Sequence, residues 1–501
     1  MTKISIAADL PRALKGASSL VVMVPEGLGE GAKFPAALPA GLGDRCRQLL
    51  RMTQPGAQGA ISWSLTDLES PAALGVAVVP GRASRHNHPA RPDLVSALLG
   101  PLGARRDKKL AIAAVLPTAD HELPLANAAY RAFPRLSYQT RSEDTPDVHL
   151  VFLDRNGAHL GIDKWAHSVA EHAQQAAEWV DTPPSNLHPS EMAKRAKARL
   201  RPLKSVRVTE IVGDKLLDAG LGGIHGVGKA AAVPPRLLVA QYGSPRAERH
   251  VALVGKGITF DTGGLHLKAR GAMEGMKADM GGAAAVLGAF EVLASHQVPV
   301  RISLLLALAE NAIGPGAFKP DDILTLHSGK TVEINNTDAE GRLLLGDAVS
   351  WAARKLECDT ILDAATLTGA QLIATGLMHA AVVSNDQDLE NRLVRAGMES
   401  GDLCHPLPFA PELYQKEFES PIADMRNSVK NRMNAQSSCA AQFVYSHLEG
   451  VDVRWGHVDL AGPAFRSDRG TGFGVGLLAQ TVAHLGSPSR RPRPRRSPAS
   501  T

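Results

Sequence analysis

Two carboxylates and an arginine alternate within residues 335–344, which read NNTDAEGRLL. Residues 330–334 before them alternate like a strand, and the apolar residues after them recur at helical spacing. Asp338, Glu340 and Arg342 are therefore predicted where a strand ends and a helix starts, which is where open α/β sheets place their site residues. Acidic residues also favour the positive end of a helix, so this run alone is equally typical of an ordinary helix N-terminus.

A glycine-rich stretch that follows the apolar run 251–254 supplies more charged residues, namely Lys256, Asp261, Lys268 and Asp279. Glycines in such a stretch let the backbone approach a ligand or a metal ion closely. Pooled with the two acids above, the chain offers four carboxylates, and no Cys or His pair has zinc-finger spacing. Oxygen-rich sites suit Mg²⁺, Mn²⁺ or a carboxylate-bridged Zn²⁺ pair, and a two-metal site is suited to hydrolysis.

The runs NTDAEGR and VGKGITFD…K…MKADMGG resemble the M17 leucyl aminopeptidases and occur in the order found in that family. The resemblance covers residues 182–485 well and the first third of the chain weakly. It implies two divalent metal ions that share five ligands, Lys256, Asp261, Asp279, Asp338 and Glu340. Asp261 and Glu340 would bridge the two ions, and Mn²⁺ or Zn²⁺ is expected, with Mg²⁺ or Co²⁺ as alternatives.

The resemblance also implies a reaction, in which a bridging hydroxide attacks the first peptide bond of a peptide and releases its N-terminal residue. That residue is expected to be Leu- or Met-like, or the enzyme is expected to accept a broad range of residues. Lys268 and Arg342 match the two catalytic positions that are not metal ligands. Lys268 would stabilise the oxyanion, and Arg342 would anchor a bicarbonate, a planar anion that suits a bidentate arginine. The alternative for Arg342 is an ion pair with a nearby carboxylate.

A pocket for the N-terminal side chain is implied by four positions that match the family's specificity pocket, Met276, Thr366, Gly369 and Ala461. Their small or apolar character fits a Leu- or Met-like residue. Residues 364–369 are equally typical of an ordinary strand-to-helix turn.

The composition is that of a globular protein, with 44% hydrophobic and 21% charged residues in a chain of 501. That length predicts two domains. Apolar runs fall short of the ~20 residues that a membrane span needs, and the N-terminus lacks the pattern of a signal peptide. The four cysteines are far apart and form no CxxC motif, which is typical of reduced thiols in a cytoplasmic protein.

The net charge of +5 comes from the end of the chain, because residues 488–501 hold five arginines and no acid. Without them the body is neutral. Residues 487–501 mix Pro, Arg and Ser and are predicted to be disordered. The arginines leave open an alternative function, an M17-like protein whose main role is DNA-binding or architectural. A dipeptidase, such as a Cys-Gly hydrolase, is a further alternative.

Both parts of the chain alternate strand-like and helix-like segments, which predicts an α/β fold. In the first part, strands are expected at 21–24, 75–79, 110–115 and 148–153, and helices at 44–51, 93–99 and 122–133. In the second, strands are expected at 250–254, 300–307, 360–363 and 380–384, and helices at 281–296, 340–356, 389–400, 435–449 and 474–485. Continuous apolar strands indicate a mostly parallel sheet that is covered on both faces.

A helix at 166–180 ends at the prolines of residues 183–184, which cannot continue it. The predicted division is 1–165, an N-terminal α/β domain; 166–184, a linker helix and proline-rich turn; 185–486, the catalytic domain; and 487–501, the tail. The resemblance implies a macro-like fold for the first domain, a role for it in oligomerisation, and a homohexamer. Short peptides are the expected partners, and nucleic acid remains an alternative one.

Overall fold

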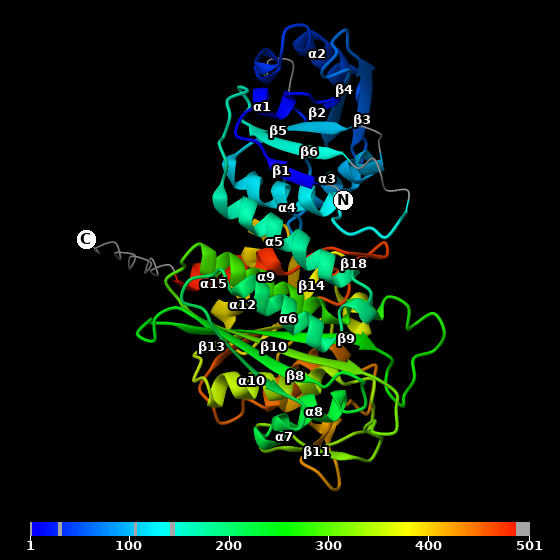
Figure 1. Cartoon of the computed structure of the whole chain (residues 1–501), viewed down its shortest axis with the longest axis vertical. Coiled ribbons are helices and arrows are strands. Elements are labelled where there is room, and N and C mark those ends of the chain that lie inside the picture. Colours follow the sequence, from blue (N-terminus) through cyan, green and yellow to red (C-terminus); the bar gives the residue numbers. More distant parts are fainter. Residues whose placement is uncertain (1–2, 29–32, 105–107, 141–145, 487–501) are drawn as a thin grey trace, which may run out of the picture.

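Two β-sheets organise the chain, and Figure 1 shows one in the upper part of the view and the other in the lower part, with helix α5 (Lys164–Asp181) between them. The computed structural model describes residues 3–28, 33–104, 108–140 and 146–486. The tail of residues 487–501, for which disorder is predicted, lies outside the described residues.

The first sheet has six strands, and all of its pairs are parallel except β3 with β4. Its order is β1 (Lys3–Ile6), β6 (Asp147–Leu153), β5 (Lys109–Val115), β2 (Ser19–Pro25), β4 (Ala73–Val79) and β3 (Ala60–Leu65). The connecting helices are α1 (Leu10–Leu14), α2 (Leu42–Met52), α3 (Pro92–Leu99) and α4 (Glu122–Ala132). The four apolar runs at residues 21–24, 75–79, 110–115 and 148–153 form strands as predicted, whereas the two edge strands had no such run.

The second sheet has eight strands, four parallel pairs and three antiparallel pairs. Its order is β15 (Cys404–Pro406), β14 (Ala380–Ser384), β17 (Arg454–Asp459), β13 (Thr360–Ala365), β9 (His250–Asp261), β10 (Arg301–Asn311), β8 (Arg236–Tyr242) and β7 (Arg207–Val212). Smaller sheets contain β11 (Ile323–Thr325), β12 (Thr331–Glu333) and β16 (Met425–Arg426), and β18 (Phe465–Arg466) with β19 (Arg469–Gly470).

Both faces of the second sheet are buried, as the continuous apolar strands predict. Val251 and Leu253 of β9 belong to one core cluster, and Ala252 and Val254 belong to another. The first face carries α6 (Pro189–Leu200), α9 (Gly281–Ser295), α12 (Gln387–Ser400) and α15 (Val475–Gly486). The second face carries α8 (Gly222–Gly228), α10 (Gly341–Arg354) and α14 (Gln436–Ser446). The three remaining α-helices of the described residues are short, α7 (Lys215–Asp218), α11 (Gly369–Ala374) and α13 (Pro411–Tyr414).

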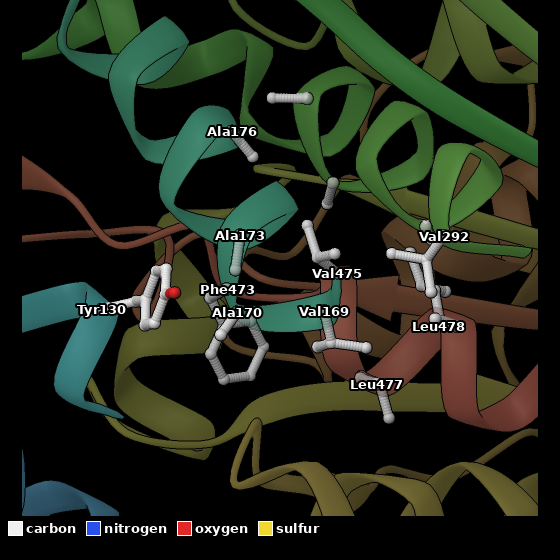
Figure 2. Packing of buried hydrophobic residues seen from close by; sticks show 14 of the residues in the cluster. Tyr130, Val169, Ala170, Ala173, Ala176, Val292, Phe473, Val475, Leu477 and Leu478 are labelled. Atoms are coloured by element: carbon white, nitrogen blue, oxygen red, sulfur yellow. The ribbon is translucent and has the colours of Figure 1, made fainter. Parts of the chain in front are cut away.

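Helix α5 joins the core of the first part to that of the second. Asp163 caps its start, because its side chain accepts hydrogen bonds from the backbone of the first turn. Its small residues let neighbouring helices approach, and Figure 2 shows them beside side chains from α4, α9 and α15. One hydrophobic cluster therefore runs from Tyr130 on α4 to Leu478 on α15.

The central strand β9 is longer than predicted, and this difference affects the site. The apolar run suggests a strand that ends at residue 254, followed by a glycine-rich loop, but β9 continues to Asp261. A side chain at Gly255 would place its Cβ 2.5 Å from Cα of Ala283 on α9, so only glycine lets the helix pack against the strand there. Lys256 and Asp261 therefore lie on a central strand.

One apolar stretch, Met276–Ser295, is long and apolar enough to cross a membrane, contrary to the expectation that apolar runs fall short of a span. In the structure it is a short 3-10 helix (η5, Met276–Met280) followed by α9, and 94% of it is buried inside the protein. It is a core helix of the second sheet. The four cysteines are free and buried, in agreement with the prediction of reduced thiols.

Candidate metal centre and active site

The predicted metal ligands come from three separate segments that meet at one cavity of about 600 Å³. Strand β9 contributes Lys256 and Asp261, and η5 contributes Asp279. Asp338 and Glu340 come from the turn between β12 and α10. The structure thus brings all five predicted ligands together.

Three of the carboxylates are close enough to share a metal ion. One oxygen from each of Asp261, Asp338 and Glu340 lies within 4.8 Å of the others. Asp261 and Glu340 are 3% and 2% exposed, so their charges need a nearby cation.

Two buried carboxylate oxygens, Oδ2 of Asp279 and Oε2 of Glu340, have no hydrogen-bond partner among the residues that the structure describes. A buried charged oxygen without a partner is costly unless a cation or a proton compensates it. Burial, together with the negative charge of the neighbouring acids, raises the pKa of both carboxyl groups. The donor set therefore fits divalent cations, which prefer carboxylate oxygens.

Lys256 lies among these acids, with Nζ 2.8 Å from Oδ1 of Asp279 and 3.0 Å from Oε1 of Glu340. Burial alone would lower its pKa, but the charges of the surrounding acids outweigh burial and raise it. The start of α10 passes very close, since a Cβ at Gly341 would lie 2.6 Å from Nζ. Glycine at that position is therefore what allows the lysine to reach both carboxylates.

Lys268 takes the other side of the cluster. Its Nζ lies 2.7 Å from Oδ2 of Asp261 and also contacts Oδ1 of Asp338. Burial would lower its pKa, and the adjacent carboxylates raise it instead, so the group stays cationic. The two lysines thus contact different carboxylates, as their different expected roles require.

Arg342 is 5% exposed and forms no ion pair with any residue that the structure describes, so the alternative of a carboxylate partner is not realised. One guanidinium nitrogen donates to the backbone oxygen of Asn427 at 2.9 Å, and the group lies 6.0 Å from the ring centre of Phe443. Its buried Nε has no partner in the described part of the chain. Burial lowers the pKa of Arg342 to about 10. The guanidinium therefore keeps a donor available for an anion.

The four predicted pocket residues, Met276, Thr366, Gly369 and Ala461, line the same cavity. Thr366 also contacts the ligands, because its hydroxyl donates to Oδ1 of Asp279 at 2.8 Å and its carbonyl accepts from Lys256 at 2.9 Å. The turn between β13 and α11 thus touches both the pocket and the metal ligands.

Three polar side chains that support the site had no signal in the sequence. Asn311 donates to Oδ1 of Asp261 at 2.8 Å, from a position on β10 that pairs with it across a β-bulge. Asn427 binds the backbone of the turn that carries Asp338, and Asp459 binds the backbone of the pocket loop. Each is far away in sequence and lies in no motif, so tertiary folding alone reveals it.

The acidic cluster with two lysines, at the end of the central strands of an α/β sheet, has the donor set of a metal-dependent hydrolase. Comparison with known proteins identifies its family. The family model "Cytosol aminopeptidase family, catalytic domain" matches residues 174–479, and the model "M17 aminopeptidase N-terminal domain 2" matches residues 57–142. The chain belongs to the M17 cytosol aminopeptidase family and is a metal-dependent aminopeptidase.

Individual relatives agree with this assignment. The human "Probable aminopeptidase NPEPL1" is 42% identical over 417 residues, which cover 80% of this chain and 78% of the relative. The leucyl aminopeptidase of Trypanosoma cruzi, in its apo form, has a TM-score of 0.87 at 38% identity and 97% coverage of both chains. The bottromycin maturation enzyme BotP, in complex with Mn, has a TM-score of 0.77 at 27% identity, covering 94% of this chain and 100% of BotP.

These findings confirm the predicted family, the two-part α/β fold and the aminopeptidase activity. They give no support to the alternatives of a DNA-binding protein or a Cys-Gly dipeptidase.

Proposed function

We propose that the chain removes the N-terminal residue of peptides with two divalent ions that are held by Lys256, Asp261, Asp279, Asp338 and Glu340. The observation that carries this proposal is the pair of buried carboxylate oxygens without a partner, on Asp279 and Glu340. The chemistry that two divalent ions supply at such a site is activation of a water molecule and polarisation of a carbonyl group. Mn²⁺ or Zn²⁺ is the proposed pair, and the Mn complex of the similar enzyme BotP supports manganese.

Lys268 would place its positive charge where the carbonyl oxygen of the substrate becomes negative. What supports this role is the position of its ammonium group between Asp261 and Asp338, at the wall of the cavity. The raised pKa keeps the group charged at neutral pH. A fixed charge that needs no rearrangement during the reaction stabilises an oxyanion more effectively than solvent does.

Arg342 would hold a bicarbonate ion that accepts and returns a proton during hydrolysis. Its guanidinium is buried, lines the cavity and has one nitrogen without a partner. A planar guanidinium matches a planar carbonate-type anion with two parallel hydrogen bonds. Because an arginine cannot itself act as a base, the anion would be the proton carrier.

The N-terminal side chain of the substrate would enter the part of the cavity lined by Met276, Thr366, Gly369 and Ala461. Gly369 leaves space, since no atom lies within 4 Å of a Cβ built there. An apolar lining with open space favours a Leu- or Met-like residue over a charged one.

We further propose that the protein is a cytoplasmic homohexamer with the domains 1–165 and 185–486 joined by 166–184. The family's description as cytosol aminopeptidases supports the location. Exposed apolar side chains support assembly, because Ile373, which lines the cavity, is 90% exposed and Met433, which follows the lining residue Arg432 in sequence, is 91% exposed. Light scattering of the full chain tests the hexamer, and a monomer at micromolar concentration contradicts it.

The decisive experiment is a metal reconstitution. The protein is stripped with a chelator and reloaded with Mn²⁺, Zn²⁺, Co²⁺ or Mg²⁺, and metal content is measured beside the release of amino acids from a panel of aminoacyl amides. We expect two ions per chain at full activity, with Leu and Met amides among the best substrates. Full activity with one ion per chain, or with none, would show that the two-metal proposal is wrong.

A further inference from the structure

Two buried side chains tie together the segments that form one wall of the cavity. The first is Asp459, the last residue of β17, which is 1% exposed. One carboxylate oxygen accepts from the backbone N–H of Leu367 at 3.1 Å and from that of Ala461 at 3.3 Å. The other accepts from the hydroxyl of Thr368 at 2.7 Å and from that of Ser437 at 3.4 Å. One carboxylate thus holds both sides of the pocket wall.

The second side chain is Gln371 of α11, which is fully buried. Its Oε1 accepts from the backbone of Gly462 at 2.6 Å, and its amide group donates to the carbonyls of Gly376 at 3.0 Å and His379 at 2.9 Å. Thr368 connects the two side chains, because its hydroxyl caps α11 by accepting from the N–H of Gln371 at 3.1 Å. The pocket loop is therefore fixed at two points to the segment after β17.

Asp459 forms no ion pair with any described residue and relies on four hydrogen-bond donors. Burial raises the pKa of its carboxyl group, and the nearby His457 opposes that rise. Burying such a group is expensive unless every bond is formed. The donors come from the pocket loop, from the segment that includes Ala461 and from α14. A neutral apolar residue would not specify the spacing of these three segments.

We propose that Asp459 is a positioning residue that, acting with Gln371, sets the width of the pocket and hence which N-terminal side chains the enzyme accepts. This inference rests on the proposed function of the pocket. Hydrophobic pockets discriminate a single methylene group by only about 10- to 200-fold, so small displacements of the wall change selectivity.

The substitution Asp459→Asn is informative because it changes one acceptor into a donor without changing the size. Its NH₂ group would face the hydroxyl of Thr368, which already accepts from Gln371, so the Thr368 contact is lost or reversed. The matched substitution Thr368→Val removes the hydroxyl and keeps the shape of the side chain. Thr368→Ser keeps the hydroxyl and should therefore keep the hydrogen bond to Asp459.

Asp347→Asn is the control for the loss of a buried carboxylate. Asp347 on α10 is fully buried and accepts from the backbone of Ile224 and of His327, each at 2.8 Å. It does not line the cavity. The same chemical change therefore occurs at a buried carboxylate that binds backbone, away from the pocket.

The experiment measures kcat and KM of the metal-loaded enzyme for Leu, Met, Val and Ala amides, together with metal content. We expect Asp459→Asn and Thr368→Val to reduce the preference for Leu over Ala about tenfold, with an unchanged metal content. Thr368→Ser and Asp347→Asn should keep the wild-type preference. If Asp459→Asn does not fold, Thr368→Val gives the answer.

A preference that stays within twofold of wild type in the informative variants overturns the inference. A loss of activity that follows loss of metal, in equal proportion for all amides, also overturns it, because that is what a merely structural role predicts. Wild-type enzyme that releases no amino acid from any amide would instead overturn the proposed function itself.

Discussion

Asn427 is the side chain on which the ligand-bearing turn depends most, and its removal gives a quantitative prediction. It is fully buried, and its carboxamide oxygen accepts from the backbone N–H groups of Asn335 at 2.9 Å and Asn336 at 3.2 Å. Its NH₂ group donates to the carbonyls of Asn336 at 2.6 Å and Ala339 at 3.2 Å. One side chain thus forms four hydrogen bonds with the turn that contains Asp338.

The variant Asn427→Ala removes all four bonds and leaves four backbone groups without their partner. At about 1 kcal/mol net for each bond, the expected loss is about 4 kcal/mol. For a cooperative unit of about 300 residues, the unfolding entropy converts this loss into a Tm lower by roughly 6 °C. Because the turn also orients metal ligands, the affinity for Mn²⁺ should fall by about 10- to 100-fold.

The assay combines thermal unfolding of the metal-free protein with chelator competition for Mn²⁺. Asn434→Ala is the matched control, since Asn434 follows in the same segment and donates to Glu417 at 2.7 Å without touching the turn. If Asn427→Ala and Asn434→Ala have the same Tm and the same Mn²⁺ affinity, Asn427 does not hold the turn and the reasoning is wrong.

Three further predictions follow from the charged groups. Asp338→Asn and Glu340→Gln should abolish turnover and lower metal content in a folded protein, and near-normal rates with full metal occupancy would refute the ligand assignment. Lys268→Ala should keep its metal and lose about 10²- to 10³-fold in kcat, whereas Lys256→Ala should lose metal. If Lys268→Ala loses metal and Lys256→Ala keeps it, the roles of oxyanion stabiliser and metal ligand are assigned to the wrong lysines. Burial raises the pKa of Asp347 to about 7 from 3.8, so its contribution to stability is complete below pH 4 and is lost as the pH rises through 7. Relative to Asp347→Asn, the wild type should therefore lose about 2 kcal/mol of unfolding free energy between pH 5 and pH 7, and parallel pH profiles would contradict this.

The five candidate ligands could be proposed from the sequence because they lie in two compact motifs whose order and spacing are visible along the chain, and the structure brings them to one cavity. Strand β17 was not predicted, although it is central to the sheet. Its sequence, Arg454–Asp459, lacks an apolar run, because His457 and Trp455 bind the buried carboxylate of Asp363 on β13. A strand whose buried residues are polar and mutually hydrogen-bonded does not resemble a core strand in sequence. Asp459 was missed for the same reason.

The supporting asparagines were unpredictable for a different reason. Asn311 binds the carboxylate of Asp261, which lies 50 residues away in sequence. Asn427 binds the backbone of Asn335, which lies 92 residues away. Their partners are defined by the register of β10 on β9 and by the packing of the segment after β16 on the turn. Such contacts leave no periodic signal, since any surface asparagine has the same local sequence pattern.

The two lysines explain how a site with this much negative charge can exist in a folded protein before metal arrives. Lys256 contacts Asp279 and Glu340, and Lys268 contacts Asp261 and Asp338, so each of the four acids has a cation within ion-pair distance. Without these cations, the buried carboxylates would repel one another in a region of low dielectric constant, and the fold would lose stability. Two oxygens still lack partners after the lysines are placed, so the lysines compensate the charge only in part. The fold is therefore stable enough to form the cavity and still retains a strong preference for cations. In the proposed two-metal site Lys256 must release a proton to become a ligand, whereas Lys268, which is not among the proposed ligands, can keep its charge.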